Sequence, residues 1–387
     1  MEKKDTLTSR ERIRLTINHK EPDRIPVEIG GGVSNFHEEL YTKLGKHYGI
    51  EYWKQWTSNW GAFKLDERLL QCLNVDVRHV WFGGGGTTSW TPVKIFSDGT
   101  FTDLWGIRYK VIDGIYSNIV ENPLRPAKTV KDIKDYFSKL PDPKAVAEAA
   151  TKNLEEEAEY LFKNTTYGIK GEPMWSHFEL CQWIRGMDEF FIDMIQNEEM
   201  AYSLFNSLFE YECKMFEIYF KKVGKFLDIV WVSDDFGAQY GLLVKKDMMV
   251  NQVKPWQKKR IDFIRERAPQ AKIFLHSCGS VYDFIPDLIE IGLDGLNPLQ
   301  PFATNMEPEK LKGEFGDKLV FMGGLDHQFI LSRPVDEVKT FVERLVKAYA
   351  PGGGYIFSTT HVMPSSAKVE SIVAAFEYIQ EIGRYLA

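Results

Sequence analysis

Eight short apolar runs recur along the chain, and a loop and then a helical pattern typically separate each run from the next. They cover residues 24–31, 75–82, 166–172, 228–235, 272–278, 293–300, 318–324 and 353–361. Strands of a parallel sheet are buried on both faces, so their sequences are continuously apolar and do not alternate. Eight such strands separated by helices predict an α/β fold, a closed (β/α)8 TIM barrel.

Two segments lie outside this rhythm. Residues 8–20 form a helical pattern with Thr8 or Ser9 as its cap, and we expect this N-terminal extension to cover the bottom of the barrel. Residues 83–125 follow the second predicted strand and contain Asp98-Gly99 between alternating runs. That pair is a strong signal for a β-hairpin. We therefore predict an inserted hairpin at residues 83–125.

The length of 387 residues suits one large barrel with insertions, because such barrels take about 250 residues or more. No linker rich in Pro, Gly or Ser divides the chain. We therefore expect a single domain over residues 1–387. The long helical pattern of residues 187–222 is expected to form one helix or two.

Charge and cysteine usage exclude several classes of function. The net charge is −7, which argues against a nucleic-acid-binding surface. The sequence contains no run of about 18 apolar residues, so it predicts no membrane span. The four cysteines are scattered, as is typical of reduced thiols. The N-terminus has no apolar signal core. We expect a cytoplasmic protein that binds neither nucleic acid nor membrane.

His276 and Cys278 lie two residues apart at the end of the fifth apolar run. Residues i and i+2 of a strand point to the same face, so their side chains are aimed at one point. Zinc prefers such nitrogen and sulfur ligands, and a catalytic zinc needs a third protein ligand. His361, at the end of the last run, is the first choice. Asp235, Glu172 and His327 follow. For His276 and His361, the structural alternative is that they only form hydrogen bonds with the loop backbone.

Other polar residues stand at the carboxyl ends of the predicted strands, where a barrel of this kind places its active site. Glu172, Asp234 and Asp235 are the acidic residues of most interest among them. Asp234-Asp235 could also supply a metal ligand, orient a histidine or cap the next helix. The predicted substrate-binding residues are Asp234, Asn297, Gln300 and Trp175. For any single tryptophan, ordinary core packing is the more common role.

Six segments together resemble the uroporphyrinogen decarboxylase superfamily. They are residues 8–31, 182–194, 233–244, 274–301, 323–328 and 355–364. The resemblance covers nearly the whole chain and implies a (β/α)8 barrel, in agreement with the eight apolar runs. True porphyrin decarboxylases carry arginines after the first strand to grip carboxylates, whereas residues 29–40 here, IGGGVSNFHEEL, contain none.

The resemblance therefore implies the corrinoid-dependent methyltransferase branch, in which a His-x-Cys pair and a late third ligand, often cysteine, hold zinc. His276 and Cys278 match this pattern, and His361 stands at the late position. The implied reaction moves a methyl group between a small donor, such as a methoxylated aromatic (O-demethylation) or a methylamine, and the cobalamin of a partner corrinoid protein; a thiol or tetrahydrofolate acceptor is the reverse case. Asp235 or Glu172 would protonate the leaving atom. The alternative is a metal-free decarboxylase of a tetrapyrrole or smaller acid.

Overall fold

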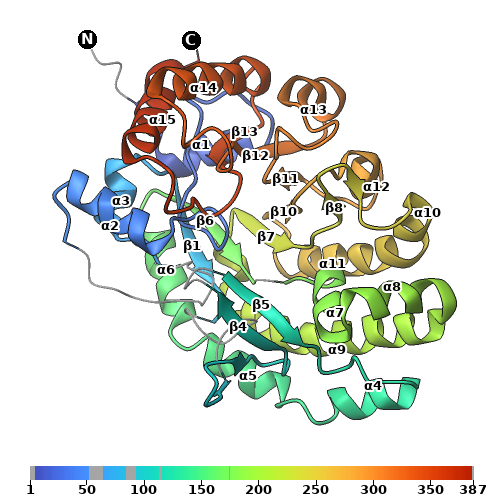
Figure 1. Ribbon diagram of the computed structural model, residues 1–387. Helices are drawn as coiled ribbons and strands as arrows, with labels where there is room; N and C mark the ends of the chain where they lie inside the picture. Colours follow the sequence, from blue (N-terminus) through green and yellow to red (C-terminus); the bar gives the residue numbers. More distant parts are fainter. Residues whose placement is uncertain (1–4, 52–63, 84–92, 113–115, 174, 386–387) are drawn as a thin grey trace.

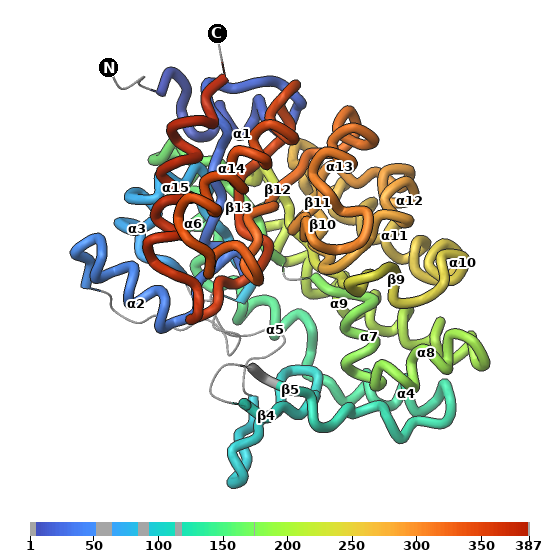
Figure 2. The backbone as a smooth tube through the Cα atoms, turned by 45° about the horizontal axis from the view of Figure 1, so that its top comes forward, coloured from blue at the N-terminus to red at the C-terminus, as the bar shows by residue number. Residues whose placement is uncertain are grey.

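A computed structural model describes residues 5–51, 64–83, 93–112, 116–173 and 175–385. Its centre is a curved sheet of seven strands that all pair in parallel. In spatial order they are β1 (Val77–Trp81), β6 (Gly168–Glu172), β7 (Ile229–Ser233), β10 (Lys272–His276), β11 (Gly295–Asn297), β12 (Val320–Leu325) and β13 (Tyr355–Thr359). Helices lie around this sheet in both views (Figure 1 and Figure 2). The predicted TIM-barrel α/β fold is confirmed.

The first apolar run closes the barrel without forming a regular strand. The amide of Glu28 donates to the carbonyl of Phe357 in β13, and the amide of Phe357 donates to Pro26, both at 2.9 Å. On the other side, the amide of Asp76 donates to the carbonyl of Val27 at 2.9 Å. Pro26 has no N–H group, so the run pairs over only a few residues. This run takes the place of an eighth strand in the barrel and bridges β13 and β1.

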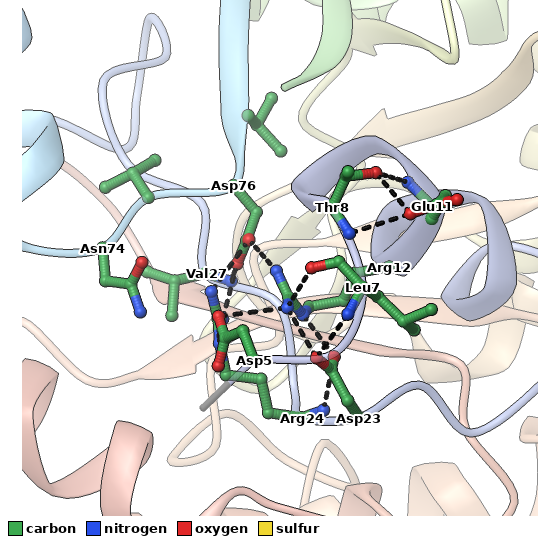
Figure 3. A network of polar contacts seen from close by, with 12 residues as sticks. Asp5, Leu7, Thr8, Glu11, Arg12, Asp23, Arg24, Val27, Asn74 and Asp76 are labelled. Carbon is green, nitrogen blue, oxygen red and sulfur yellow. Dashed lines mark hydrogen bonds and ion pairs between the residues drawn. The ribbon is translucent and has the colours of Figure 1, made fainter. Parts of the chain in front are cut away.

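A buried ion network holds this closing run in place (Figure 3). The carboxylate of Asp76 accepts hydrogen bonds from Arg12 at 2.6 Å, from Arg24 at 2.7 Å and from the amide of Val27 at 2.8 Å. Asp23 also accepts from Arg12, at 2.7 Å. Both guanidinium groups are 1% exposed, and buried charges are tolerated only when they are paired. Asp76 therefore ties the N-terminal segment to the start of β1.

Helix α1 (Ser9–Thr16) plugs the amino-terminal end of the barrel, as predicted. Thr8 caps it, and Glu11 completes a capping box. Ile13 lies so close to Gly168 of β6 that a Cβ atom there would lie 2.9 Å from Ile13 Cγ1. The interior of the barrel is a separate apolar cluster formed by Ile13, Ile17, Val77, Ile229, Trp231, Phe274, Val320, Met322 and Ile356.

The outer helices pack against the outside of the sheet, where they form the larger apolar core. They are α2 (Glu38–His47), α3 (Glu67–Cys72), α4 (Val130–Phe137), α5 (Pro143–Ala150), α6 (Leu154–Asn164), α7 (Phe178–Arg185), α8 (Met187–Gln196), α9 (Glu198–Val223), α10 (Lys246–Met248), α11 (Lys254–Arg267), α12 (Ile285–Glu290), α13 (Pro308–Phe315), α14 (Val335–Tyr349) and α15 (Val369–Ile382). Residues 187–222 thus form two helices. Across the described ranges, no helix is both long and apolar enough to cross a lipid bilayer.

The insertion after β1 is larger than the predicted hairpin. Asp98-Gly99 does turn between β2 (Lys94–Ile95) and β3 (Phe101–Thr102), but two further strands, β4 (Arg108–Ile112) and β5 (Tyr116–Glu121), extend the antiparallel sheet. The second turn forms because Asp103 accepts hydrogen bonds from the amides of residues 105 and 107. Figure 2 shows this sheet at the edge of the molecule.

Candidate metal centre and active site

His276 and Cys278 occupy the carboxyl end of β10, and His361 follows β13. The ligand atoms of these three residues lie within 4.8 Å of one another. His276 Nε2 and Cys278 Sγ are 3.4 Å apart. The three residues that the sequence nominates as metal ligands thus meet at one point. Two imidazoles and a thiol match the donor set of a catalytic zinc that keeps one position open.

The orientation of His276 suits a metal ligand. Its Nδ1 lies 2.7 Å from Oδ1 of Asn297, whose Nδ2 donates to the carbonyl of Met322 at 3.0 Å. Because the amide group is fixed in this way, Nδ1 carries the proton and the lone pair of Nε2 faces Cys278. Burial lowers the pKa of His276 to about 4, and burial with the nearby His276 lowers that of His361 to about 4. Both rings are therefore neutral at pH 7.

The electrostatics around Cys278 favour a bound cation. Burial, with Asp235 and Glu179 nearby, raises the pKa of the Cys278 thiol well above its usual value. A thiolate at this position therefore needs a positive charge, and a coordinated metal ion supplies one. The residues present fit zinc.

Asp235 lies beside the ligand cluster. Its Oδ1 accepts a hydrogen bond from the amide of Cys278 at 2.8 Å and lies 3.9 Å from His276 Nε2. Burial and the charge of Asp234 raise the pKa of Asp235 to about 6, although the bond from Cys278 opposes this shift. A carboxyl group with this pKa can hold a proton near neutral pH.

Asp234 points away from the cluster and is fully buried. Its carboxylate accepts from the amides of His177 at 3.1 Å and Glu179 at 2.8 Å, and from Gln257 at 2.7 Å. It therefore satisfies amides at the start of α7, and the predicted substrate contact is wrong for this residue. A structural role in a helix start was one of the alternatives that the sequence left open, although the helix is α7 and not the one that follows.

Glu172 belongs to a second, separate cluster with Glu28 and His79, whose ligand-type atoms also lie within 4.8 Å of one another. The ammonium group of Lys170 lies 2.9 Å from a carboxylate oxygen of each glutamate and already serves as the cation there. Burial opposes ionisation, yet Lys170 and His79 lower the pKa of Glu172 to about 2. The structure thus pairs Glu172 with Lys170 and His79 and does not bring it into the cluster of His276, Cys278 and His361, so its role as a proton donor stays a prediction.

This buried ion cluster anchors the loop that follows the closing run. Glu172 accepts from the amide of Gly32 at 2.8 Å, and Glu28 accepts from Ser34 Oγ at 2.8 Å. The loop then leads to His37, whose amide donates to the carbonyl of Met363 at 2.8 Å. The cluster thus places His37 beside the segment that carries His361.

A cavity of about 780 Å³ opens onto two of the three candidate metal ligands, Cys278 and His361. Its lining consists of His37, Gly237, Ala238, Gln239, Cys278, Gly279, Gln300, His327, Gln328, His361, Val362, Pro364, Ser365 and Ser366. None of these described lining residues is Lys, Arg, Asp or Glu. The wall therefore carries imidazole, amide and hydroxyl groups beside small and apolar residues such as Ala238, Val362 and Pro364.

Several residues of this wall could not be found from strand ends. His37 stands well beyond the closing run, and its Nδ1 has no hydrogen-bond partner among the described residues. Gln239 and Ser365 likewise lie in loops beyond the strand ends. His327 lines the cavity, and its Nδ1 lies 2.7 Å from Thr360 Oγ1.

The remaining predicted substrate contacts have different positions. Trp175 is fully buried, its indole donates to Glu212 at 2.7 Å and its ring packs on Phe216, so it is a core residue and its predicted substrate contact is wrong. Asn297 is 1% exposed and contacts His276, so it does not reach the cavity either. Gln300 does line the cavity, and it also contacts Cys278.

Comparison with known proteins places this geometry in context. Uroporphyrinogen decarboxylases from two Coxiella burnetii strains, Dugway 5J108-111 and RSA 331 / Henzerling II, are 31% identical in sequence to this protein over 65 residues, which is 17% of this chain. That match spans only 18% of the length of these relatives. A methyltransferase from Methanosarcina mazei shares the fold, with a TM-score of 0.64 and 14% identity, over 97% of this chain and 99% of that chain.

A family model agrees with the barrel and extends well beyond the short match to the decarboxylases. The model described as uroporphyrinogen decarboxylase (URO-D) matches residues 102–382, from the inserted sheet to the last helix. This span is more than half of the chain and includes β6, β7 and β10 to β13, together with His276, Cys278 and His361. The chain therefore belongs to the uroporphyrinogen decarboxylase family.

Proposed function

We propose that this protein is a zinc-dependent methyltransferase that moves a methyl group between a small donor and the cobalamin of a separate corrinoid protein. The observation that carries the proposal is the cluster of His276, Cys278 and His361 at a cavity. The fold shared with the Methanosarcina mazei methyltransferase is compatible with it. Sulfur-containing zinc sites suit alkyl transfer, whereas hydrolytic sites more often use only nitrogen and oxygen ligands.

The three ligands would hold zinc through His276 Nε2, Cys278 Sγ and a ring nitrogen of His361. When bound, the ion acts as a Lewis acid on the heteroatom that carries or accepts the methyl group. The chain itself supplies the orientation of each ligand. Asn297 holds the tautomer of His276, and the amide of Cys278 is held by Asp235.

Asp235 is the proposed proton donor. Its Oδ1 is engaged by the amide of Cys278, and the other oxygen can carry the proton. The Oδ1 atom lies 3.9 Å from His276 Nε2, so the carboxyl group is next to the ligand atoms, where a donor heteroatom would lie. Proton transfer to the leaving oxygen or nitrogen requires such proximity.

The lining of the cavity favours an uncharged methyl donor, such as a methoxylated aromatic compound. Anionic substrates are normally gripped by Arg or Lys, and none is found among the described lining residues. The same observation disfavours a metal-free decarboxylase of a polycarboxylated tetrapyrrole. Methylamines remain the second class of donor to be tested.

A metal analysis and a methyl-transfer assay test the proposal. We expect about one zinc per chain and formation of methylcobalamin when the protein, free cob(I)alamin and a methoxylated aromatic donor are mixed. Cys278→Ala should lose both properties, while Cys213→Ala, a cysteine on α9, should keep both. Substrate turnover without metal or corrinoid, or full zinc content in Cys278→Ala, would contradict the proposal.

A further inference from the structure

We propose that Asn297 and Gln300 are positioning residues that act as a pair, each orienting one of the two zinc ligands at the carboxyl end of β10. Asn297 serves His276, and Gln300 serves Cys278. This inference rests on the proposed zinc site. It assigns to the segment Asn297–Gln300, which the sequence suggested as a substrate contact, a role in setting the affinity and electronic character of that site.

Register brings the first pair together. His276 of β10 and Asn297 of β11 are direct partners in the parallel ladder. The Nδ1 atom of His276 lies 2.7 Å from Asn297 Oδ1, which also accepts from the indole of Trp231 at 3.2 Å. The opposite end of the amide donates to Met322 O at 3.0 Å. A flipped amide would place its NH2 group against two donors, so only one orientation of Asn297 satisfies all three neighbours.

The consequence for His276 is a fixed tautomer and a fixed ring plane. Both residues are almost completely buried, so water cannot replace the amide as the acceptor. Hydrogen-bond partners of this kind set the basicity and orientation of a ligating imidazole. Their loss typically weakens metal binding about 10- to 100-fold.

Gln300 lies three residues farther along and reaches the second ligand. Its Oε1 accepts from the amide of Gly279 at 2.6 Å, and its Nε2 donates to Cys278 Sγ at 3.7 Å. Gly279 has φ +75°, and a Cβ atom there would lie 2.6 Å from the carbonyl of Ala238. The chain after Cys278 therefore has one tightly enclosed path, and Gln300 holds it.

The N–H···S contact has an electronic effect in addition to the steric one. A donor aimed at sulfur withdraws charge from a thiolate, as hydrogen bonds to ionised groups generally do. Asp235 accepts from the amide of Cys278 at 2.8 Å. The backbone around Cys278 is thus held by both Asp235 and Gln300, while the charge of the sulfur is tuned by Gln300.

Matched variants separate the two roles. Asn297→Leu keeps the size of the side chain and removes the acceptor, whereas Asn297→Asp keeps the acceptor. Gln300→Leu removes both contacts, whereas Gln300→Glu keeps the acceptor for Gly279 and removes the donor to sulfur. Asn251→Leu and Gln196→Glu, at exposed positions, are the controls. Thermal melting of each variant shows whether it folds.

Two readouts other than activity are used: zinc affinity from competition with a chromophoric chelator, and the thiolate-to-metal charge-transfer band of the Co²⁺-substituted protein. We expect Asn297→Leu to bind zinc about 10- to 100-fold more weakly. Asn297→Asp keeps the acceptor for His276 but loses the donor to Met322, and it should bind zinc more tightly than Asn297→Leu. Gln300→Leu and Gln300→Glu should both shift the charge-transfer band to longer wavelength. The Asn297 variants should shift it little.

The possible results are distinguishable. If all four variants match wild type in affinity and spectrum, the pairing is wrong although the zinc site stands. If Gln300→Glu keeps the wild-type band, the N–H···S contact has no electronic role and that half of the inference fails. If the wild-type protein itself binds neither zinc nor cobalt at Cys278, the proposed function fails, and this inference fails with it.

Discussion

The imidazole of His276 and the carboxamide of Asn297 are joined by a 2.7 Å hydrogen bond between adjacent strands of the barrel. This bond turns an ordinary strand-end histidine into one whose Nε2 lone pair faces Cys278 Sγ at 3.4 Å. The metal-binding capacity of the site therefore depends on a residue that does not touch the metal. The same hydrogen bond gives the buried Nδ1–H group of His276 a partner, so a neutral histidine can occupy this position.

The identity of the third ligand can be tested by comparing the two histidines of the cavity wall. Loss of a residue that only hydrogen-bonds to a metal ligand typically weakens zinc binding about 10- to 100-fold. We expect His361→Ala to weaken zinc binding more than this, because it removes a ligand itself. His327→Ala should change zinc affinity little, since the Nδ1 atom of His327 is engaged by Thr360. Chelator competition measures both. The reverse pattern would reassign the third ligand to His327.

The barrel closure depends on Asp76. Replacing it with Ala leaves Arg12 and Arg24 as buried charges with one fewer carboxylate, which should reduce the free energy of unfolding by about 3–5 kcal/mol. Asp135→Ala breaks an exposed pair with Lys131 and should cost less than about 1 kcal/mol. Urea denaturation measures both values. Equal effects for the two variants would show that the network does not hold the closure.

Acid should destabilise the protein through Glu172. Its pKa is about 2 in the folded state and near 4.5 when unfolded, so the folded state gains stability above about pH 4.5. That contribution declines as the pH falls from 4.5 towards 2. Unfolding free energies of wild type should therefore decrease more steeply from pH 5 to 3 than those of Glu172→Gln. Glu337→Gln, at an exposed position, should follow wild type; parallel curves for all three proteins would refute the effect.

The plug formed by α1 can be tested by a double-mutant cycle. Gly168→Ala forces a methyl group against Ile13 and should cost about 1–3 kcal/mol, while Ile13→Ala should cost about 2–5 kcal/mol. The double variant should be more stable than the sum of the two losses predicts, because the new methyl group enters the space that is vacated. Strict additivity in urea denaturation would mean that the contact is absent.

A matched glycine provides the control for this cycle. Gly313 lies inside α13, and a Cβ atom added there would have no neighbour within 4 Å. Gly313→Ala should therefore leave stability unchanged or raise it by about 0.5–1 kcal/mol through the helix preference of alanine. A loss comparable with that of Gly168→Ala would indicate a general sensitivity to Ala in place of Gly.

Much of the site was predictable because it depends on local geometry. Continuous apolar runs report strands buried on both faces, so the barrel follows from eight of them. The alternation of a strand places His276 and Cys278 on one face without any knowledge of the fold. Placing His361 at the carboxyl end of the last run then requires only that the strands be parallel.

The roles of Glu172, Asp234 and Trp175 could not be read in this way. A glutamate at a strand end can be a proton donor or an ionised partner, and the choice depends on Lys170 and on residues from other strands. Asp234 and Asp235 are adjacent in sequence and directly follow β7, yet the first contacts the start of α7 and the second contacts Cys278. An aromatic residue such as Trp175 has the same sequence signature in a pocket and in a core.

By itself, the sequence determined the parallel strands, the plug at the bottom of the barrel and the His-x-Cys pair, because periodicity and short spacing act within one element. The tertiary structure decided which groups meet between elements. It brought Asn297 to His276, Gln300 to Cys278 and His37 to the cavity. These contacts depend on register and loop paths, and the protonation state of a buried group follows from the charges and hydrogen bonds that such contacts place around it.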